Sequence, residues 1–460
     1  MLQELKGYLL ILIVVMSSGC STKYTKEPTI EKSYDMTTTS DHFIFIDNEG
    51  IMRDVNNKKI FKHEQSIKDI FKKFDSLKKI DNDLSIVIYI HGGLNKFDDT
   101  INRVENTYKR ILANKQYPIF ISWESGPLTN YSDHLFAIRN GERDLLKAIP
   151  SSPFILIEDA LRSIARIPAS SWNIIGGQTN VSISILTDEE KNAYKSEYRI
   201  DNNTSMHVHS DSQSTGHDFF DFATIINPTK FVTAPFIDGL GKGAWRSMLR
   251  RSDLILHSQE AYEGKGENGG KTAAYDFLDR LNKEYHDTNK TLIGHSMGTI
   301  VANNILIRFP DLNFNTVVYM AAACKIKDLE QSVVPWLKKD DNRTFYNLTL
   351  NPYRDINENS FYDFFPRGSL LVWIDDFLED VNSFEDRTAG YWFNIVRSAE
   401  VVFPKDIRNQ VHLTKFGIKD CSPQNHGEFD DFTFWKQNFW LNNESEIKSI
   451  IQNKQYCQTY

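Results

Sequence analysis

Short apolar runs alternate with amphipathic segments along most of the chain. The run SIVIYI at 85–90 is continuous, apolar and β-branched, as is typical of buried parallel strands. Further strands are predicted at 117–123, 291–294, 315–323 and 344–350, with a weaker one at 411–416. Apolar residues recur at helical spacing at 98–115, 271–285 and 299–309, and Pro310 ends the last of these segments. Strands that alternate with helices predict an α/β protein with a mostly parallel central sheet and helices on both faces.

The amino-acid composition indicates which class of protein this is. The 460 residues are 40% hydrophobic and 25% charged, which indicates a globular chain rather than a disordered or collagen-like one. A net charge of −8 gives no reason to expect nucleic acid as a partner. The length fits one large domain with insertions as well as it fits two domains.

The N-terminal residues 1–20 have the features of a processing signal. A lysine near the start is followed by the apolar run YLLILIVVM, which is too short to span a bilayer, and then by SSGC. This arrangement resembles a bacterial lipoprotein signal, in which Cys20 carries the lipid after cleavage, although Ser17 stands where leucine is usual. An uncleaved anchor or a plain secretory signal is the alternative. Residues 21–40 are expected to form a polar tether.

The remaining cysteines give no metal-binding pattern. Cys421 and Cys457 would be able to pair in an exported protein, and Cys324 is expected to be buried beside a run of alanines. Three unpaired thiols are the alternative. The sequence contains no CxxC pairing or zinc-like spacing.

Ser296 lies in GHSMG, between the strand-like run 291–294 and a helical segment. A serine in such a sharp strand-to-helix turn has strained backbone angles, and bulky neighbours two places away on either side would collide. Gly294 and Gly298 remove those collisions, with His295 and Met297 between them. The turn places the hydroxyl above the carboxyl edge of the sheet, at the positive end of the helix. Ser296 is therefore the candidate nucleophile.

The segment from about 85 to 440, apart from an interruption at 126–251, resembles the serine α/β-hydrolases. This resemblance depends on the serine motif and on the downstream HisGlyGluPhe, and it implies the α/β-hydrolase fold with chain order serine, acid, histidine. Residues 41–125 and 252–460 would form the hydrolase domain. The resemblance implies a Ser-His-Asp triad that needs no metal or organic cofactor.

Two positions in this order match the base and the acid. His426 follows the strand 411–416 in the loop SPQNHGEF, where the family keeps its catalytic histidine. Asp355 lies a few residues beyond the strand 344–350, and Glu358 and Asp363 are nearby alternatives.

The oxyanion hole is expected to pair the N–H of Met297 with one from the loop HisGlyGly at 91–93. His91 and Gly92 belong to that loop, and the sequence leaves open whether Gly93 or Leu94 donates. An ordinary β-turn is the alternative. Trp123 and Ser125, after the next strand, resemble a feature of bacterial esterase-like hydrolases, and core packing plus a turn explains them equally.

The interruption at 126–251 is expected to be a helical insertion that acts as a lid or cap. Residues 152–172 form an amphipathic helix that suits an acyl pocket, a lipid contact or packing on its own core. MHVHSDSQSTGHD (206–218) is read as a polar loop rather than a metal site. LGKGAWRSMLRRS (240–252) is read as a helix that is solvated or touches anionic lipid head groups.

These features favour an enzyme that cleaves carboxylic esters, with an acyl ester as its substrate and the membrane as its partner through the N-terminal lipid. The membrane tether favours lipid or phospholipid esters among these substrates. The signal and Ser21 after the cysteine favour an envelope lipoprotein in the outer membrane of a Gram-negative host. An acyltransferase of the same fold and a non-catalytic envelope lipoprotein are the alternatives.

Overall fold

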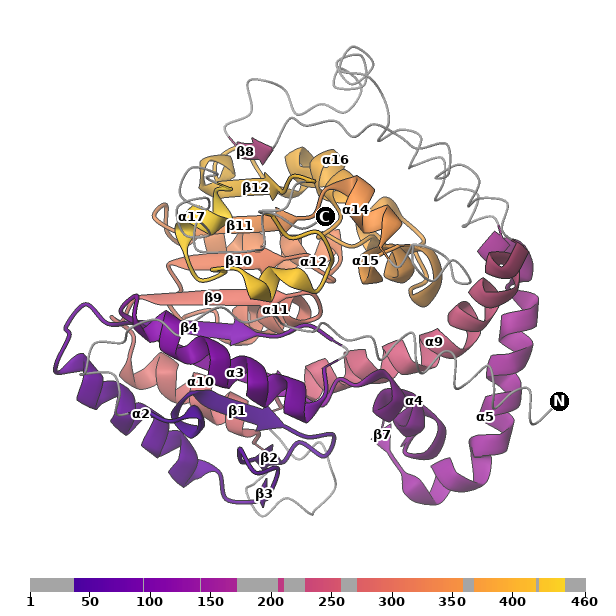
Figure 1. The fold of residues 1–460 in the computed structure, drawn as a ribbon, viewed down its shortest axis with the longest axis horizontal. Coiled ribbons are helices and arrows are strands. Elements are labelled where there is room, and N and C mark those ends of the chain that lie inside the picture. The colour runs from indigo at the N-terminus through magenta and orange to yellow at the C-terminus, as the bar shows by residue number, and fades with distance from the viewer. Residues whose placement is uncertain are drawn as a thin grey trace, which may run out of the picture.

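A ten-stranded sheet runs through the centre of the protein, with helices on both of its faces (Figure 1). The computed structural model describes residues 37–93, 95–140, 142–171, 206–210, 228–257, 271–358, 368–418 and 422–442. In spatial order the strands are β3 (Lys59–Ile60), β2 (Met52–Arg53), β1 (Phe43–Ile46), β5 (Gln116–Trp123), β4 (Ser85–Ile90), β9 (Lys290–His295), β10 (Thr316–Met320), β11 (Thr344–Thr349), β12 (Val411–Lys415) and β8 (His207–Ser210).

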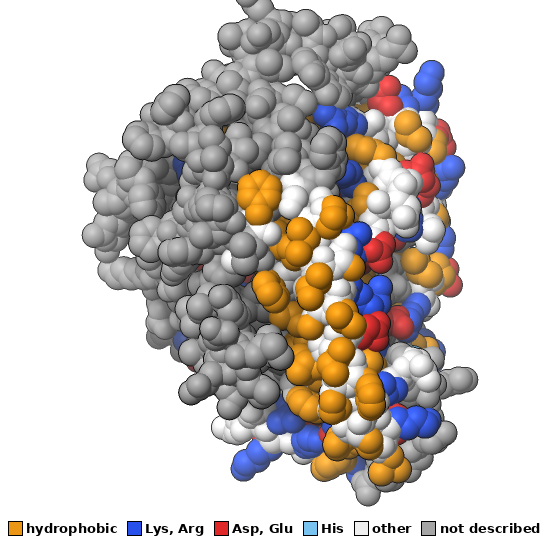
Figure 2. Space-filling model, turned by 90° about the vertical axis from the view of Figure 1, so that its right-hand side faces the viewer, with side chains coloured by type: hydrophobic (Ala, Val, Ile, Leu, Met, Phe, Trp, Pro, Cys, Tyr) orange, Lys and Arg blue, Asp and Glu red, His pale blue; other side chains and the backbone are white. Residues whose placement is uncertain are grey.

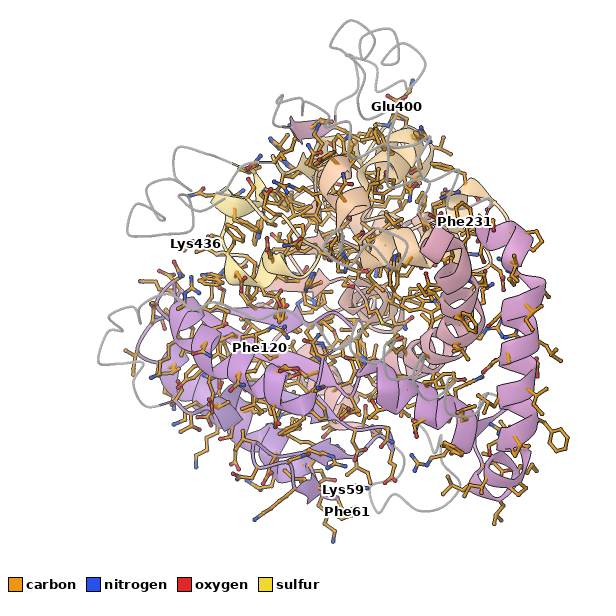
Figure 3. The ribbon with its side chains drawn as sticks, turned by 45° about the vertical axis from the view of Figure 1, so that its right-hand side comes forward. Lys59, Phe61, Phe120, Phe231, Glu400 and Lys436 are labelled. Atoms are coloured by element: carbon orange, nitrogen blue, oxygen red, sulfur yellow. The ribbon has the colours of Figure 1, made fainter. Side chains whose placement is uncertain are left out.

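The sheet is parallel from β1 to β8, and β2 and β3 continue it antiparallel at one edge. Its central strands are buried on both faces, as their unbroken apolar sequences require. The α/β class and the mostly parallel sheet predicted from the sequence are confirmed. In Figure 3, Phe120 of β5 lies inside the molecule, whereas Lys59 and Phe61 lie at the edge formed by the β2–β3 hairpin.

The helices of the main body connect these strands. They are α2 (Glu64–Lys78), α3 (Phe97–Leu112), α10 (Ala273–Glu284), α11 (Gly298–Arg308), α12 (Ile326–Gln331), α13 (Val333–Leu337), α14 (Pro352–Asn357), α15 (Leu370–Trp373), α16 (Trp392–Val402) and α17 (Gln437–Trp440). Short 3-10 turns lie at η2 (Thr39–His42), η5 (Phe384–Asp386), η6 (Arg408–Gln410) and η7 (Glu428–Asp431), and η4 (Ile374–Leu378) is a π-helical turn.

Three helices, two of them the longest in the described structure, form an arm at one side of the sheet (Figure 1). These are α4 (Pro127–Phe136), α5 (Leu145–Ala165) and α9 (Pro228–Leu254), with the small hairpin of β6 (Ile138–Arg139) and β7 (Glu142–Arg143) between the first two. Helix α9 packs against α4, α5 and η4. The arm is therefore helical and rests on the main body through α9.

The expected polar loop at 206–218 is wrong for its first part. Residues 207–210 form β8, which pairs with β12 and extends the sheet, and the rings of His207 and His209 lie against His412. Period-2 alternation over four residues is too short a signal to separate such an edge strand from a loop. Residues 211–218 lie outside the described part of the chain. No group of metal-ligating side chains suited to an ion occurs among the described residues.

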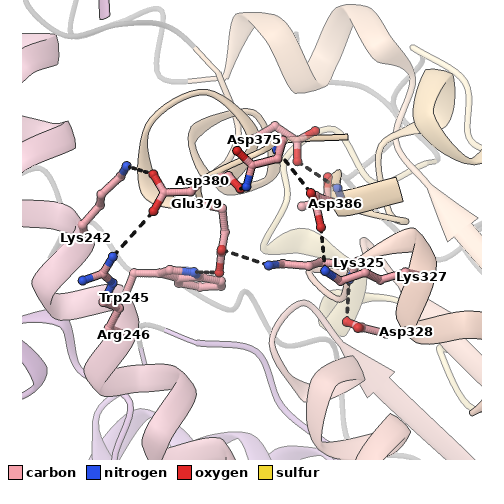
Figure 4. A network of polar contacts seen from close by, with 12 residues as sticks. Lys242, Trp245, Arg246, Lys325, Lys327, Asp328, Asp375, Glu379, Asp380 and Asp386 are labelled. Carbon is pink, nitrogen blue, oxygen red and sulfur yellow. Dashed lines mark hydrogen bonds and ion pairs between the residues drawn. The ribbon is translucent and has the colours of Figure 1, made fainter. Parts of the chain in front are cut away.

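The basic stretch 240–252 is mostly buried, so the expectation of a helix that is solvated or touches lipid head groups is wrong for most of it, and Arg246 alone keeps 60% of its side chain exposed. Trp245 is buried, and its indole N–H donates to Glu379 at 2.6 Å, as Figure 4 shows. Lys242 pairs with Asp380 at 2.6 Å (Figure 4). The buried Arg251 donates to the carbonyl oxygen of Glu124 at 2.6 Å and pairs with Asp133 of α4 at 2.6 Å. The charges of α9 are paired within the protein, so this stretch attaches the arm to the main body.

Cys324 is a free, buried thiol, as expected from the sequence. Cys20, Cys421 and Cys457 lie outside the described residues. Among the helices that the structure describes, none is both long enough and apolar enough to cross a membrane.

Candidate active site

Ser296 occupies a tight turn between β9 and α11, with a positive φ of 51°. This left-handed conformation is strained for any residue with a Cβ. A Cβ on Gly298 would lie 2.2 Å from the carbonyl oxygen of Ile90, and one on Gly294 would lie 3.0 Å from that of Gly298. Only glycine fits at these two positions, so the GxSxG spacing follows from the close approach of β4, β9 and α11.

The side chain of His426 meets the hydroxyl of Ser296. Its Nε2 lies 2.7 Å from the Ser296 Oγ, and both residues are buried. Burial, and then the charge of His295, lower the pKa of His426 to about 3. The imidazole is therefore neutral near pH 7 and able to accept a proton from the hydroxyl.

The other ring nitrogen of His426 is available for an acid. Its Nδ1 is buried and has no hydrogen-bond partner among the described residues. A base in this position needs a group that holds the ring in one tautomer and balances the charge it acquires. Three carboxyl groups were candidates from the sequence.

Asp355 follows β11 in α14 and is fully buried. Neither carboxylate oxygen has a well-aligned hydrogen bond among the described residues, and burial, offset in part by the nearby hydroxyl of Ser369, raises the pKa of Asp355 to about 7. No hydrogen bond joins Asp355 to His426 in the described part of the chain. The described contacts therefore do not bring the Asp355 carboxyl group to the imidazole. The charged groups that act on His426 are His295 and Asp430.

Glu358 is engaged with the backbone of the base. Its Oε2 accepts the backbone N–H of His426 at 2.8 Å, and burial raises the pKa of Glu358 to about 8, with a further increase from the nearby Asp355. Glu358 therefore holds the loop that carries His426. Asp363 lies outside the described residues.

The oxyanion loop packs directly onto the Ser296 turn. A Cβ on Gly92 would lie 2.8 Å from the Cβ of Ser296, and one on Gly93 would lie 2.6 Å from the sulfur of Met297. A side chain at position 92 would therefore collide with the nucleophile itself, and one at position 93 would require the Met297 side chain to move. Met297, at the start of α11, is buried beside the two glycines.

Asn95 fixes the direction of the peptide groups in this loop. Its side-chain Nδ2 donates to the carbonyl oxygens of Gly92 at 2.8 Å and Gly93 at 3.0 Å. In a trans peptide the C=O and the following N–H point in opposite directions, and the described residues contain no cis bond. Because Asn95 holds the Gly92 carbonyl, the N–H of Gly93 points away from Asn95. Leu94, the other candidate donor, lies outside the described residues.

His91 joins this loop to the neighbouring strand. Its ring stacks on Trp123 at 4.4 Å, and its Nε2 accepts the Trp123 backbone N–H at 3.2 Å. Burial lowers the pKa of His91 to about 3, so its Nδ1 carries the proton and donates to the Gly92 carbonyl. Ser125 accepts the backbone N–H of Asn95 at 3.1 Å. Trp123 and Ser125 thus support the oxyanion loop.

His295, between the glycine and the nucleophile, links the turn to the base. One ring nitrogen donates to the carbonyl oxygen of His426 at 2.9 Å, and the other lies 3.1 Å from Asp430. Asp430 also accepts the hydroxyl of Tyr89 at 2.6 Å. The sequence identified His295 only as part of the turn, whereas the structure shows that it holds the His426 loop.

Arg103 connects the two halves of the site and was not anticipated. From α3 its Nε lies 2.7 Å from Asp430, and its Nη2 donates to the side chain of Asn95 at 3.1 Å. One chain of contacts therefore runs from His426 through His295, Asp430, Arg103 and Asn95 to the oxyanion loop. An arginine on the apolar face of the helix at 98–115 was the available sequence signal, because a buried arginine needs a partner.

Comparison of the chain with models of known families, with curated proteins and with solved structures gives no match. The function is therefore inferred from the geometry of the site itself.

Proposed function

We propose that the protein is a serine hydrolase of the α/β-hydrolase fold that cleaves carboxylic esters through an acyl-enzyme. The observation that carries this proposal is the contact of 2.7 Å between the Ser296 hydroxyl and His426, at a turn where Ser296 has a positive φ. A buried, neutral imidazole beside a strained serine is the arrangement that activates a hydroxyl as a nucleophile.

The reaction would proceed in two steps. Ser296 Oγ attacks the ester carbonyl carbon while His426 Nε2 takes its proton, and the N–H groups of Met297 and Gly93 stabilise the oxyanion. His426 then protonates the departing alkoxide. Water, with its proton removed by the same imidazole, then attacks the acyl carbon, the bond from that carbon to Ser296 Oγ breaks to release the carboxylic acid, and His426 returns the proton to Ser296 Oγ.

Asp355 is our proposed acid. Neither its buried oxygens nor the buried Nδ1 of His426 have a well-aligned hydrogen bond among the described residues, and the positive charge that forms on the imidazole would attract the carboxylate. Glu358 is already bound to the backbone N–H of His426, which favours Asp355 for the ring. No residue of this mechanism requires a metal or organic cofactor.

We also propose that the protein is an envelope lipoprotein, anchored through lipid on Cys20, with passage to the outer membrane in a Gram-negative host. The support is the apolar run and SSGC at the N-terminus. Replacing Cys20 by serine should abolish incorporation of a labelled fatty acid and release the protein from membranes. Equal label in both forms would contradict lipid attachment at this thiol.

The ester chemistry is tested by hydrolysis of a short-chain p-nitrophenyl ester by the full-length protein in detergent. Ser296→Ala and His426→Ala should each lower kcat/KM by at least about a thousandfold, because each removes a group that acts in the transition state. Ser40→Ala and His286→Ala, at exposed positions, are the matched controls and should leave the rate unchanged. Hydrolysis that survives Ser296→Ala would refute the proposal.

A further inference from the structure

The outer face of α5 exposes a continuous row of large apolar side chains. Figure 2, which views the side of the molecule where α5 lies, shows them as a stripe along the helix. The exposed fractions are 89% for Leu146, 58% for Ile149, 73% for Phe154, 56% for Ile157, 60% for Leu161 and 62% for Ile164. We call these six residues the α5 row.

The opposite face of α5 is polar and buried. Asp159 and Ser163 are almost completely inaccessible, and Asp159 contacts His134 at 3.1 Å and the hydroxyl of Tyr131 at 3.3 Å. A Cβ on Gly239 of α9 would lie 1.8 Å from the Ser163 hydroxyl, so the two helices touch through small residues. From the sequence, one alternative for residues 152–172 was that their apolar face packs on the protein's own core. The exposed side chains of the α5 row show that this alternative is wrong.

This polarity is the reverse of that of a surface helix in water. Such a helix normally turns its apolar stripe to the core and its polar face to solvent. Polar groups and small residues between helices, with apolar side chains outside, are instead the pattern of helices that contact lipid. The α5 row therefore does not pack in the core of this protein, and we expect a separate apolar partner to cover it.

The margins of the row carry charges in the arrangement typical of interfacial helices. Lys147 has 75% of its side chain exposed, and Glu158 and Arg162 form an exposed pair beside the row. The row itself contains no charged residue over the 21 residues of α5, a length of about 31 Å. An apolar face with charged flanks suits the boundary between head groups and acyl chains.

A second copy of the chain is a weaker candidate for the occupant. The α5 row is a single helix face about 31 Å long and about 10 Å wide, and a second copy would need a face of matching shape to form a specific interface on so narrow a strip. A bilayer needs no complementary shape, so this size is no obstacle to lipid binding.

The chain outside the described residues would allow contact with a bilayer. Residues 21–36 connect the proposed lipid on Cys20 to Thr37, where the described structure begins, and can reach at most roughly 55 Å. A tether of that reach permits the lipid and α5 to enter the same membrane. We propose that the α5 row docks into the surface of a phospholipid bilayer, with the axis of α5 in the membrane plane.

This docking surface does not depend on the ester chemistry, since it involves no residue of the candidate active site. It would nevertheless hold the site near lipid. Helix α9 packs against α5, and its Met248 sulfur lies 3.8 Å from the position a Cβ on Gly93 would occupy. A substrate dissolved in the bilayer would then lie close to the arm, whose helix α9 adjoins the oxyanion loop.

The test is the collisional accessibility of a spin label in the full chain bound to vesicles of phosphatidylethanolamine and phosphatidylglycerol. The label is attached at Phe154→Cys in the row and, as a matched control, at Ile80→Cys, which is 58% exposed after α2. Cys421→Ser and Cys457→Ser remove competing thiols, and Cys324 is buried. Relaxation is measured with oxygen, which dissolves in the bilayer, and with a water-soluble nickel chelate.

If the row lies in the bilayer, the ratio of oxygen to nickel accessibility at Phe154→Cys should exceed that at Ile80→Cys by at least about tenfold. High nickel accessibility at both positions would show that water covers the row and would overturn the proposal. Low accessibility to both reagents at Phe154→Cys would overturn it as well, because a second copy or another segment of this chain would then cover the row.

A second experiment measures how strongly the protein binds to vesicles, rather than how deeply a label lies in the bilayer. In the Cys20→Ser protein, Leu146→Ser with Leu161→Ser should weaken partitioning into the same vesicles by at least about tenfold, because two apolar side chains leave the interface. Ile80→Ser with Val401→Ser, equally apolar and exposed elsewhere, should change it less than about twofold. Equal effects of the two pairs would contradict a specific docking face, whatever the outcome for ester hydrolysis.

Discussion

The ion pair of Arg103 and Asp430 gives a sharp prediction about how the site is held together. Arg103→Met keeps most of the apolar stem and removes the guanidinium group. In the wild type, only 5% of the Arg103 side chain and 1% of the Asp430 side chain are exposed, and the two charged groups lie 2.7 Å apart. The substitution leaves Asp430 buried with Tyr89 and His295 as its remaining partners.

The size of the effect follows from this burial. Removing one partner of a buried ion pair costs about 3–5 kcal/mol of unfolding free energy, because the other charge stays out of water. An exposed pair such as Arg280 with Glu284 is worth at most about 1 kcal/mol, so Arg280→Met is the matched control. Adding Asp430→Asn to Arg103→Met should recover part of the loss, which a double-mutant cycle measures.

The loss should also depend on pH in a defined direction. Burial alone would raise the pKa of Asp430, but the charges of Arg103 and His295 and the hydrogen bonds from His295 and Tyr89 bring it below its ordinary value. A depressed pKa stabilises the folded state above the unfolded pKa of about 3.9. Without Arg103 this attraction is weaker, so the destabilisation by Arg103→Met should be full at pH 7 and should become smaller as pH falls below about 3.9, where the Asp430 carboxylate becomes protonated.

Catalysis should fall together with stability, since Arg103 holds Asn95 and Asn95 holds two carbonyls of the oxyanion loop. Loss of one aligned oxyanion donor lowers kcat by about 10²–10³-fold. We therefore expect Arg103→Met and Asn95→Ala each to lower kcat by at most this factor. Unfolding in urea and ester hydrolysis below the unfolding transition are the assays. A destabilised Arg103→Met protein with unchanged kcat would refute the positioning role, and unchanged stability would refute the buried pair.

Three further predictions concern the acids and the Ser296 turn. Asp355→Asn should lower kcat on the p-nitrophenyl ester more than Glu358→Gln does, because we assign Asp355 to the imidazole of His426; the reverse order would transfer the role to Glu358. Burial raises the pKa of Glu358 to about 8, so this group should cost the wild type stability in urea as pH rises from about 4.3 to 8. Glu358→Gln should make that loss smaller, and the remainder comes from other buried acids such as Asp355; parallel pH profiles would contradict the shift. Gly298→Ala should lower the unfolding free energy by about 1–3 kcal/mol or more, since its Cβ would lie 2.2 Å from the carbonyl of Ile90; a fully stable variant would show that the turn can relax.

The strands that form the centre of the sheet were predictable because each is an unbroken apolar run between turn signals. β4, β9, β10 and β11 coincide closely with the predicted ranges, and α3, α10 and α11 follow from their apolar periodicity. β1 (Phe43–Ile46) and β8 (His207–Ser210) were missed, since each has four residues and is identified only by its pairing with a distant strand.

The arm shows where periodicity is insufficient. The sequence identified the amphipathic segment at 152–172 but not which side of the helix would be buried. Hydrophobic patterning assumes that the apolar face packs inward, whereas in α5 the contacts of Asp159 and Ser163 bury the polar face. Trp245 and Arg251 were likewise read as exposed because their ion-pair and hydrogen-bond partners are remote in sequence.

Most candidate site residues came from the sequence because the strand-turn-helix context of GHSMG restricts where a base and an oxyanion loop can lie. The residues that hold the site together did not. Arg103 contacts both Asn95 and Asp430, and more than three hundred positions of the chain separate these two partners. The contacts form only when α3 packs against the 422–442 segment. Local pattern contains no information about such contacts.

The central claim, that Ser296 is an activated nucleophile, is tested most directly by reaction of the full-length protein with a fluorophosphonate. A stoichiometric mass increase located by peptide mass spectrometry on Ser296 is the predicted result, and the adduct should be absent from Ser296→Ala and form much more slowly in His426→Ala. A folded wild type that does not react, or one that reacts at another serine while Ser296 stays unmodified, would contradict the claim.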